Sequence, residues 1–235
     1  MKFHVLTIFP DFFRGPFDHG VIQKAREAGH IEIQIHDLRF WTHDRHRTVD
    51  DRPFGGGEGM LLKAGPLFEA VEAIWPERHA GTRDPARRVV LLSAQGRKFD
   101  QRLARQFAQA RELLLICGRY EGVDERVAEH LADDEICVGD FVLSGGELAA
   151  AMVVDVVARL KEGVLGNQDS AQFESFGEEG LLDAPAYTRP AEFRAWRVPA
   201  ALLSGNHEEI RKWRRRAALE KTARLRPDLW EAKKT

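Results

Sequence analysis

The most constraining feature of this sequence is an alternation of short apolar runs with amphipathic stretches over residues 1 to about 162. Strand-like length and composition occur in HVLTIF, IEIQIHDL, RRVVLLSA, LLLICG and EICVGDFVLS. Helical periodicity occurs between or after them, in FDHGVIQKAREAG, DQRLARQFAQA, VDERVAEHLA and ELAAAMVVDVVARL. Because strands that alternate with helices form crossover units, the pattern predicts an α/β fold with a mostly parallel sheet.

The last of these helices should begin after Ser144-Gly145-Gly146-Glu147, where Ser144 and Glu147 have the spacing of a capping box. Its body, Leu148 to Leu160, is apolar on almost every side apart from Asp155. A helix of this kind is buried all round, so we expect to find it inside the core or against another subunit.

Composition places the chain among ordinary globular proteins. Hydrophobic residues make up 43% and charged residues 31% of the 235 residues, which excludes a disordered, collagen-like or fibrous chain. The longest strongly apolar run, Leu148 to Val154, is too short to span a bilayer, so no membrane partner is expected. The first residues, MKFHVLTIFPDFF, contain no apolar stretch of secretory length, so we also expect no signal peptide.

The two cysteines, Cys117 and Cys137, each lie in an apolar strand-like run. Neither belongs to a CxxC motif or has a histidine at ligand spacing, so buried free thiols are favoured over metal or redox use. Free thiols indicate a reducing compartment, and we expect a cytoplasmic protein.

The C-terminal region differs from the rest of the chain in charge. Residues 194–235 contain 12 Lys or Arg against 5 Asp or Glu. Asn206 and Glu209 have the spacing of a helix start, and the helix after them carries Ile210, Trp213 and Ala217 on one face. Its basic side chains could form a solvated face or a nucleic-acid footprint, and the residues alone leave both readings open.

Glycine-containing segments follow three of the expected strands, at residues 93–96, 118–122 and 138–147. Ligands of open α/β sheets bind at the carboxyl ends of the strands, where glycine lets a ligand approach the main chain. Turn formation alone would explain any one of the segments, but three at one sheet edge favour a shared pocket. The sequence has neither GxGxxG after a strand nor GxxxxGK[ST], which disfavours the common nucleotide-binding folds.

Residues 41–60 form a polar loop that ends in a glycine stretch, Gly55-Gly56-Gly57-Glu58-Gly59. His43 and His46 could bind a metal, but the intervening arginine would repel a cation and no third ligand is evident. Contact with phosphate or with a base suits the Arg and His side chains of this loop better.

Five longer segments of the sequence are characteristic enough to indicate a particular family. HDRHRTVDDRPFGGGEGM, CGRYEGVDERV, VGDFVLSGGEL, LLDAPAYTRP and LLSGNHEEIRKWR occur in this order. Together they closely resemble the bacterial tRNA (guanine-N1)-methyltransferases of the TrmD family, SPOUT-superfamily enzymes that modify G37 beside the anticodon. The resemblance covers nearly the whole chain. It implies a trefoil-knotted domain, a homodimer, bent S-adenosylmethionine in the knot and a tRNA site shared between subunits.

The resemblance also implies a division of the chain and a set of cofactor-binding residues. Residues 1–162 would form the knotted cofactor-binding domain, 163–176 a flexible linker or lid, and 177–235 a helical, basic tRNA-binding domain. The residues matched to the cofactor pocket are Ser93, Gly118, Tyr120, Glu121, Val138, Gly139, Asp140, Phe141, Val142, Leu143, Gly145 and Gly146. Ala94 stands where the family usually has proline, a loss that could loosen this loop slightly.

The chemistry of guanine indicates which catalytic groups are needed. N1 carries a proton at neutral pH, so a carboxylate must remove that proton before N1 can attack a methyl group, while a guanidinium can stabilise the charge that builds on O6. The target base should be flipped out of its stack to reach the pocket. By resemblance the base is Glu174, where the family has Asp, with Asp169 as the competing carboxylate, and Arg159 acts at O6. As a structural alternative, Arg159 would only meet the dipole at a helix end.

Further residues match the substrate side of the family's site: Ser170, Asp183, Arg211, Arg214 and Arg215. In this context the basic helix is expected to bind tRNA through salt-sensitive phosphate contacts. The family's Mg²⁺ dependence would carry over too, although we assign no metal ligands. Two alternatives remain. One is a non-catalytic SPOUT-fold RNA-binding protein, which Glu174 in place of the family's Asp favours, and the other is a SPOUT methyltransferase for another RNA position.

Overall fold

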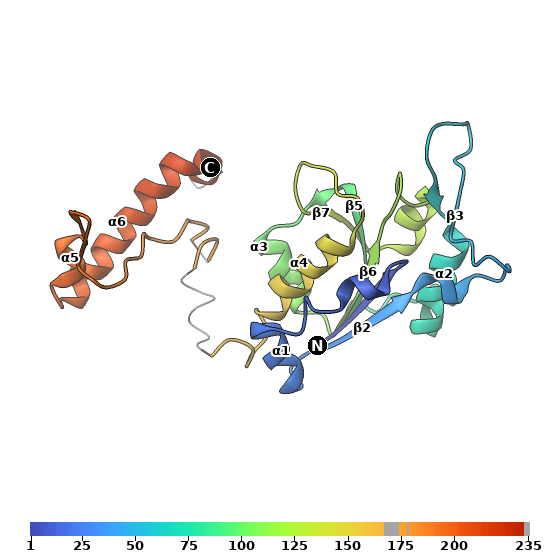
Figure 1. The fold of residues 1–235 in the computed structure, drawn as a ribbon, viewed down its shortest axis with the longest axis horizontal. Helices are drawn as coiled ribbons and strands as arrows, with labels where there is room; N and C mark the ends of the chain where they lie inside the picture. Colours follow the sequence, from blue (N-terminus) through green and yellow to red (C-terminus); the bar gives the residue numbers. More distant parts are fainter. Residues whose placement is uncertain (167–173, 178, 233–235) are drawn as a thin grey trace. The chain divides into compact units, whose positions relative to one another are not determined.

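The structure is a computed structural model that describes residues 1–166, 174–177 and 179–232 (Figure 1). The chain forms two compact units, residues 1–166 and residues 167–235.

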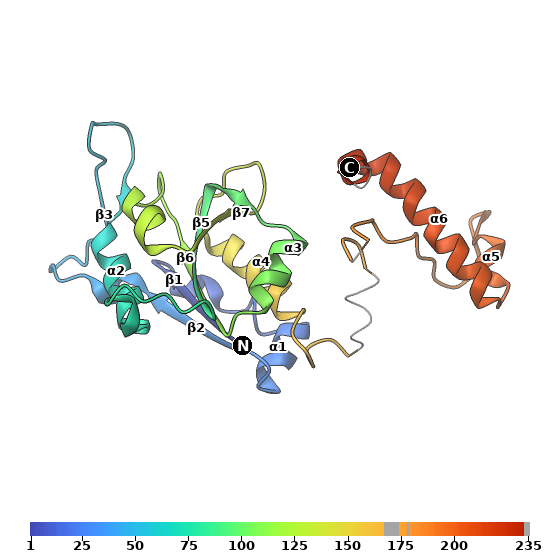
Figure 2. The ribbon, with the colours of Figure 1, turned by 180° about the vertical axis from the view of Figure 1, so that it is seen from behind.

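Unit 1 contains a five-stranded sheet with helices on both faces (Figure 2). Its strands are β1 (Lys2–Thr7), β2 (Glu32–Asp37), β5 (Arg87–Lys98), β6 (Glu112–Cys117) and β7 (Asp134–Cys137), with a separate short pair, β3 (Asp50–Asp51) and β4 (Leu61–Leu62). Its α-helices are α1 (Gly20–Glu27), α2 (Ala64–Ile74), α3 (Gln101–Ala108) and α4 (Glu147–Ala158). Shorter helical turns are η1 (Pro10–Phe13), η2 (Leu38–Trp41), η3 (Pro76–Arg78) and η4 (Val127–Leu131).

The main sheet has the order β2-β1-β6-β5-β7, and every neighbouring pair of its strands is parallel. This confirms the α/β fold that the alternating pattern predicts. The central strands β1 and β6 and the first half of β5 are buried on both faces, as expected for a sheet covered on both sides, whereas the edge strand β2 is only partly buried. That the connections of this sheet close a trefoil knot stays a prediction.

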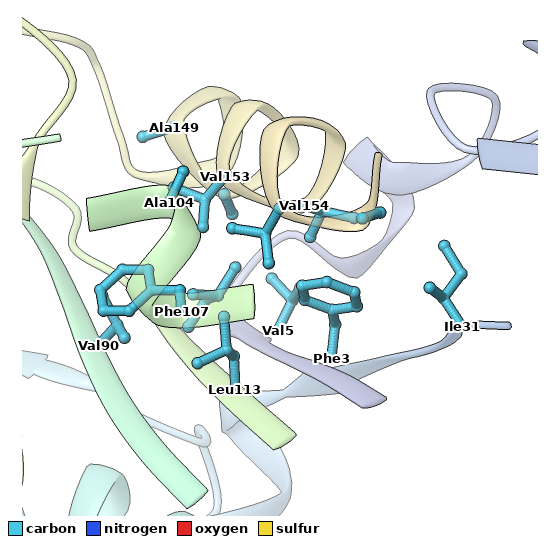
Figure 3. Close-up of a cluster of buried hydrophobic side chains, with 14 of the residues drawn as sticks. Phe3, Val5, Ile31, Val90, Ala104, Phe107, Leu113, Ala149, Val153 and Val154 are labelled. Carbon is cyan, nitrogen blue, oxygen red and sulfur yellow. The ribbon is translucent and has the colours of Figure 1, made fainter. Parts of the chain in front are cut away.

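One face of the sheet packs against α1, α3 and α4 (Figure 3). Phe3 and Val5 of β1 point to this face together with Val90 of β5 and Leu113 of β6, because side chains two residues apart in a strand share a face. The opposite face carries Leu6, Leu91 and Leu114 among others, and packs against α2 and η4. Two buried clusters therefore enclose the sheet and fix the positions of its carboxyl ends.

Helix α4 departs from the prediction at its start. Its N-cap is Gly146, and no side chain caps it, so the capping box predicted for Ser144 and Glu147 is wrong. The Glu147 carboxylate is instead buried, where it accepts a 2.7 Å hydrogen bond from Thr7 Oγ1. On the sheet side α4 is buried as expected, but Leu148 and Met152 remain about half exposed in the single chain.

Three other elements also differ from the sequence pattern. Strand β7 ends at Cys137, whereas the run EICVGDFVLS predicts a strand through residue 144. VDERVAEHLA, which has helical periodicity, forms only the one-turn π-helix η4. Helix α2 has no counterpart in the predicted pattern, because its first turn contains Gly65 and Pro66 and its N-cap, Lys63, is not a capping residue.

Unit 2 combines a hairpin with helices in the part that the structure describes. Its elements are β8 (Glu192–Phe193), β9 (Trp196–Arg197), α5 (Ala200–Leu203), α6 (His207–Leu225) and α7 (Pro227–Ala232). Asn206 caps α6 by accepting hydrogen bonds from the backbone N–H of Glu208 and Glu209, which confirms the predicted helix start. No helix among the described residues is long and apolar enough to cross a membrane.

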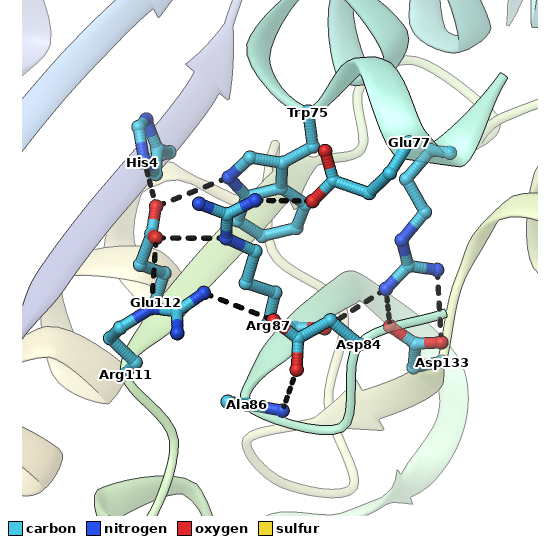
Figure 4. A network of polar contacts seen from close by, with 10 residues as sticks. His4, Trp75, Glu77, Asp84, Ala86, Arg87, Arg111, Glu112 and Asp133 are labelled. Carbon is cyan, nitrogen blue, oxygen red and sulfur yellow. Dashed lines mark hydrogen bonds and ion pairs between the residues drawn. The ribbon is translucent and has the colours of Figure 1, made fainter. Parts of the chain in front are cut away.

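A buried polar network lies near the amino ends of β5 and β6 (Figure 4). Glu112 accepts hydrogen bonds from Arg87 Nε at 2.9 Å and Trp75 Nε1 at 3.2 Å, and it lies 3.3 Å from His4 Nε2. Burial raises the pKa of Glu112, but the hydrogen bonds from Arg87, Trp75 and His4 outweigh it and lower that pKa to about 2. Burial, together with the nearby His4 and Lys2, lowers the pKa of the neighbouring His36 to about 4.

We predict that the stability of the protein falls as the pH is lowered below 6.5. The unfolded chain takes up a proton at His36 near its ordinary pKa of 6.5, whereas the folded protein does so only near 4. Protonation therefore favours the unfolded state in this window, and below pH 4.5 loss of the Glu112 carboxylate adds to the effect.

Urea denaturation at pH 7.5 and pH 5 measures the effect. The free energy of unfolding should drop on the order of 1 kcal/mol through His36, allowing for its partial exposure. His36→Gln should reduce the difference between the two pH values, while substitution of the exposed His130 should not. An unchanged pH dependence in His36→Gln would contradict the assignment.

Candidate active site

A cavity of about 310 Å³ opens at the carboxyl ends of β6 and β7, beside the middle of β5, from which residues 91–95 contribute. All three glycine-containing segments found in the sequence contribute to its wall, from residues 93–95, 118–122 and 138–146. The prediction that they form a shared pocket is therefore confirmed. Its lining combines apolar side chains such as Leu92 and Ile136 with main-chain atoms of the glycine segments.

The residues matched to the cofactor pocket come together at this cavity with one exception. Its lining includes Ser93, Gly118, Tyr120, Glu121, Val138, Gly139, Phe141, Val142, Leu143, Gly145 and Gly146. Asp140 is not among the lining residues. Its side chain is 85% exposed and lies 3.3 Å from Lys98 Nζ.

The first wall segment is looped out of a continuous strand. Leu92 and Arg97 of β5 both pair with Ile136 of β7, so the residues between them leave the ladder as a bulge. At the end of this bulge a Cβ atom on Gly96 would lie 2.3 Å from the backbone nitrogen of Ile136. Only glycine fits where the chain rejoins the sheet.

The second and third wall segments touch through their backbones. Gly146 N–H donates a 2.9 Å hydrogen bond to Gly118 O, and Arg119 forms an isolated bridge with Gly145. A Cβ atom on Gly146 would lie 2.8 Å from the Cα atom of Cys117. The approach therefore requires glycine, and it brings residues 138–146 back over the end of β6.

A buried ion pair holds this contact in place. Glu147, 1% exposed, accepts a 3.0 Å hydrogen bond from Arg119 Nε in addition to the bond from Thr7. Arg119 also donates to Ser144 O at 2.9 Å and lies 4.6 Å from the centre of the Phe9 ring. The end of β1, the residues after β6 and the start of α4 are thus joined at one carboxylate. No local sequence pattern indicates this cluster, because Thr7, Arg119 and Glu147 are far apart in the chain.

The two cysteines lie at the end of the strands beside the cavity. Both are free and buried, as predicted, and Cys137 contributes to the cavity wall. Burial raises the pKa of the Cys117 thiol, and the nearby Glu147 carboxylate raises it further. Cys117 is therefore a protonated packing residue at neutral pH.

The glycine end of the polar loop borders the cavity. Glu121 N–H donates a 3.1 Å hydrogen bond to Met60 O, and a Cβ atom on Gly59 would lie 2.4 Å from Cγ of Glu121. His43 pairs instead with Glu69 at 2.7 Å. Within residues 1–166, 174–177 and 179–232, no group of three or more His, Cys, Asp or Glu side chains could hold a metal ion.

Comparison with known proteins identifies the family to which the chain belongs. The family model described as tRNA (Guanine-1)-methyltransferase TrmD matches residues 1–232. The chain belongs to this family. It is 58% identical to the tRNA (guanine-N(1)-)-methyltransferase of Koribacter versatilis, over 98% of this chain and 92% of the relative. Relatives of the same name from Geobacter sulfurreducens and Dehalococcoides mccartyi are each 52% identical, over 97% or 98% of this chain and 91% of each relative.

The two residues expected to be catalytic, Arg159 and Glu174, are not among the residues that line the cavity of unit 1. Arg159 is the C-cap of α4, where its backbone N–H donates to Asp155 O at 3.2 Å. Glu174 and Asp183 belong to unit 2. Asp169 and Ser170 lie outside the described residues.

The TrmD-family arginines expected to bind tRNA all lie on α6 of unit 2. Arg211, Arg214 and Arg215 are exposed, and Arg215 lies 3.5 Å from Glu179. On the same helix Lys212 pairs with Glu208 at 2.7 Å. Unit 2 therefore presents a row of cationic side chains along one helix.

We predict that Glu147→Ala lowers the free energy of unfolding by about 2–3 kcal/mol, because it leaves Arg119 and Thr7 without their buried partner. Urea denaturation at pH 7.5 measures the loss. Asp140→Ala removes a carboxylate of an exposed pair and should change the stability by less than about 0.5 kcal/mol. Equal stability of both variants would show that the Glu147 cluster contributes little.

Proposed function

We propose that the protein transfers a methyl group from S-adenosylmethionine to N1 of guanosine 37 in tRNA. The observation that carries this proposal is the cavity at the carboxyl ends of β6 and β7 and the bulge of β5, in a chain that belongs to the TrmD family. The relatives at 52–58% identity bear the name tRNA (guanine-N(1)-)-methyltransferase. Such a name specifies the base and the atom, and the resemblance adds position 37.

The cavity is suited to S-adenosylmethionine in size and in lining. A volume of about 310 Å³ falls within the range of small-molecule sites, and such sites combine apolar walls with a few polar groups. Backbone N–H and C=O groups of residues 118, 138, 139 and 141–143 can pair with an adenine edge, while Leu92 and Ile136 provide apolar contact. We assign cofactor binding to the predicted residues that line this cavity. Asp140, which does not, would act at its rim.

The acceptor nitrogen requires a base. S-adenosylmethionine supplies a methyl group on a positively charged sulfur. The Glu174 carboxylate removes the proton from guanine N1, and the freed electron pair of N1 forms a bond to the methyl carbon as the carbon–sulfur bond breaks. The electron pair of that bond stays on sulfur and cancels its charge. Arg159 stabilises the negative charge that builds on O6 during proton removal.

Hydrogen bonds of the main chain hold the backbone around Glu174 in place within unit 2. The Glu174 carbonyl accepts a hydrogen bond from Gly177 N–H at 3.0 Å, and Phe176 N–H donates to Leu181 O at 2.8 Å. Asp183 N–H donates to Ser175 Oγ at 2.9 Å. Residues 174–177 are thus attached to the segment that contains Asp183, which we place on the substrate side.

We predict that Glu174→Gln lowers the single-turnover rate of methyl transfer by about 100-fold or more, because the amide cannot accept the N1 proton. Affinity for S-adenosylmethionine, measured by calorimetry, should remain within about twofold, since the proposed contacts to it lie in unit 1. Glu174→Asp restores a carboxylate and should be faster than Glu174→Gln. If Asp169→Asn abolished transfer while Glu174→Gln kept the wild-type rate, the base would be Asp169.

The basic helix is the proposed tRNA-binding element. Arg211, Arg214 and Arg215 are exposed on α6 and would contact phosphates, which carry the salt-dependent part of RNA binding. Flipping a guanine out of its stack costs free energy, and contacts between the enzyme and the RNA must offset that cost. We therefore assign residues 177–235 to tRNA binding, residues 163–176 to a lid and residues 1–162 to cofactor binding.

An apolar surface of unit 1 supports a homodimer. Leu148 and Met152 on α4 are about half exposed, beside a helix face that is otherwise buried, and Phe12 and Val21 are exposed to a similar degree. A second copy of the chain would cover α4 in the way that its all-round apolar sequence predicts. We also propose a cytoplasmic location and a Mg²⁺ requirement in catalysis, with no residues assigned to the metal.

Mass spectrometry of tRNA treated with the purified protein and S-adenosylmethionine tests the function. We expect one added methyl group, at N1 of G37, and no product with a transcript that carries A37. A methyl group at another nucleotide would identify a different RNA methyltransferase. Binding of RNA without any methyl transfer would identify a non-catalytic relative.

A further inference from the structure

The hairpin of unit 2 places two large aromatic side chains side by side. Strands β8 and β9 pair so that Phe193 lies directly opposite Trp196, with ring centres 6.3 Å apart. Between them Arg194 and Ala195 have φ angles of 50° and 66°, the left-handed region that most residues avoid. A two-residue hairpin turn requires this conformation and normally uses Asn and Gly. The chain therefore keeps a strained turn that presents the two rings together.

Both rings are exposed. Trp196 is 70% exposed and Phe193 is 57% exposed, while Tyr187 nearby in the sequence is 50% exposed. Tyr187, Phe193 and Trp196 line a cavity of about 550 Å³ together with Arg189 and Arg197. Single exposed apolar residues are common on proteins, but three aromatic rings around one hollow mark a binding surface.

The charge around the hollow favours a nucleic acid as the occupant. The Arg194 guanidinium lies 5.3 Å from the centre of the Phe193 ring. The ring centres of Tyr187 and Trp213 are 6.4 Å apart. Trp213 belongs to α6, the helix that carries the exposed arginines. An aromatic platform beside a row of cationic side chains suits an unpaired base and its phosphates, because every base has a flat face that stacks on aromatic rings.

We propose that Trp196 and Phe193 of the β8–β9 hairpin stack on an unpaired base of the bound tRNA. The site lies entirely within unit 2 and is distinct from the cavity of unit 1. The proposal rests on the proposed function and extends it, because it adds a contact to a base of the RNA beside the contacts to phosphates.

Substitutions of Trp196 test the stacking. The probe is an unmodified tRNA transcript with G37, labelled at its 3′ end, and its Kd for the full-length protein is measured by fluorescence anisotropy. Trp196→Leu keeps an apolar side chain but removes the ring face, and should raise Kd at least about fivefold, since stacking contributes about 1–3 kcal/mol per base. Trp196→Phe keeps a ring and should stay within about threefold of the wild type.

Salt dependence separates stacking from phosphate contact. The slope of log Kd against log salt should be the same in Trp196→Leu as in the wild type, because no phosphate contact is lost. Arg214→Ala should reduce that slope by about one phosphate contact. Leu203→Ala removes an exposed apolar side chain of the same unit outside the hollow and should leave Kd unchanged.

Two results would overturn the proposal. Wild-type affinity in Trp196→Leu would show that no base stacks on the ring. A change in the molecular mass of Trp196→Leu in sedimentation equilibrium, without RNA, would show that the hairpin packs against a second copy of the chain. Failure of the proposed function is distinguishable, because it appears as absence of m1G37 in tRNA treated with the wild-type protein.

Discussion

Close contact between two stretches of backbone determines the shape of the cavity. Residues 138–146 return to the end of β6, where Gly146 lies so near Cys117 and Gly118 that no Cβ atom could be accommodated. Glu147 then ties this contact to β1 through Thr7 and Arg119. Because a buried carboxylate without partners costs free energy, the hydrogen bonds from Thr7 and Arg119 favour the arrangement of these segments that forms the cavity.

Much of unit 1 follows from local pattern. A short, nearly continuous apolar run is encoded within each central strand, so the parallel sheet could be predicted from the runs alone. The position of a cavity at the carboxyl ends of the strands follows from the same topology, and the glycine segments marked which strands contribute. The cap of α6 could be predicted as well, because Asn206 bonds to residues two and three positions ahead of it.

The remaining features depend on contacts that no local window contains. Thr7 and Glu147 are 140 residues apart, and their hydrogen bond takes Glu147 away from the capping role that its spacing suggested. The run after Cys137 has strand composition, but it leaves the sheet to meet residues after β6. The β8–β9 turn contains neither Gly nor Asn, so its sequence gave no hairpin signal.

The bulge in β5 separates the looped residues from the pairing of the strand. The ladder with β7 stops at Leu92 and resumes at Arg97 on the same partner residue, Ile136, so the looped segment does not set the register of the strand. Ala94 lies inside this segment. Sequence drift there is mechanically isolated from the hydrophobic layers on either side of the sheet. Apart from Gly96, where a Cβ atom would collide with Ile136, the residues of this loop can change and alter ligand fit without disturbing the fold beneath it.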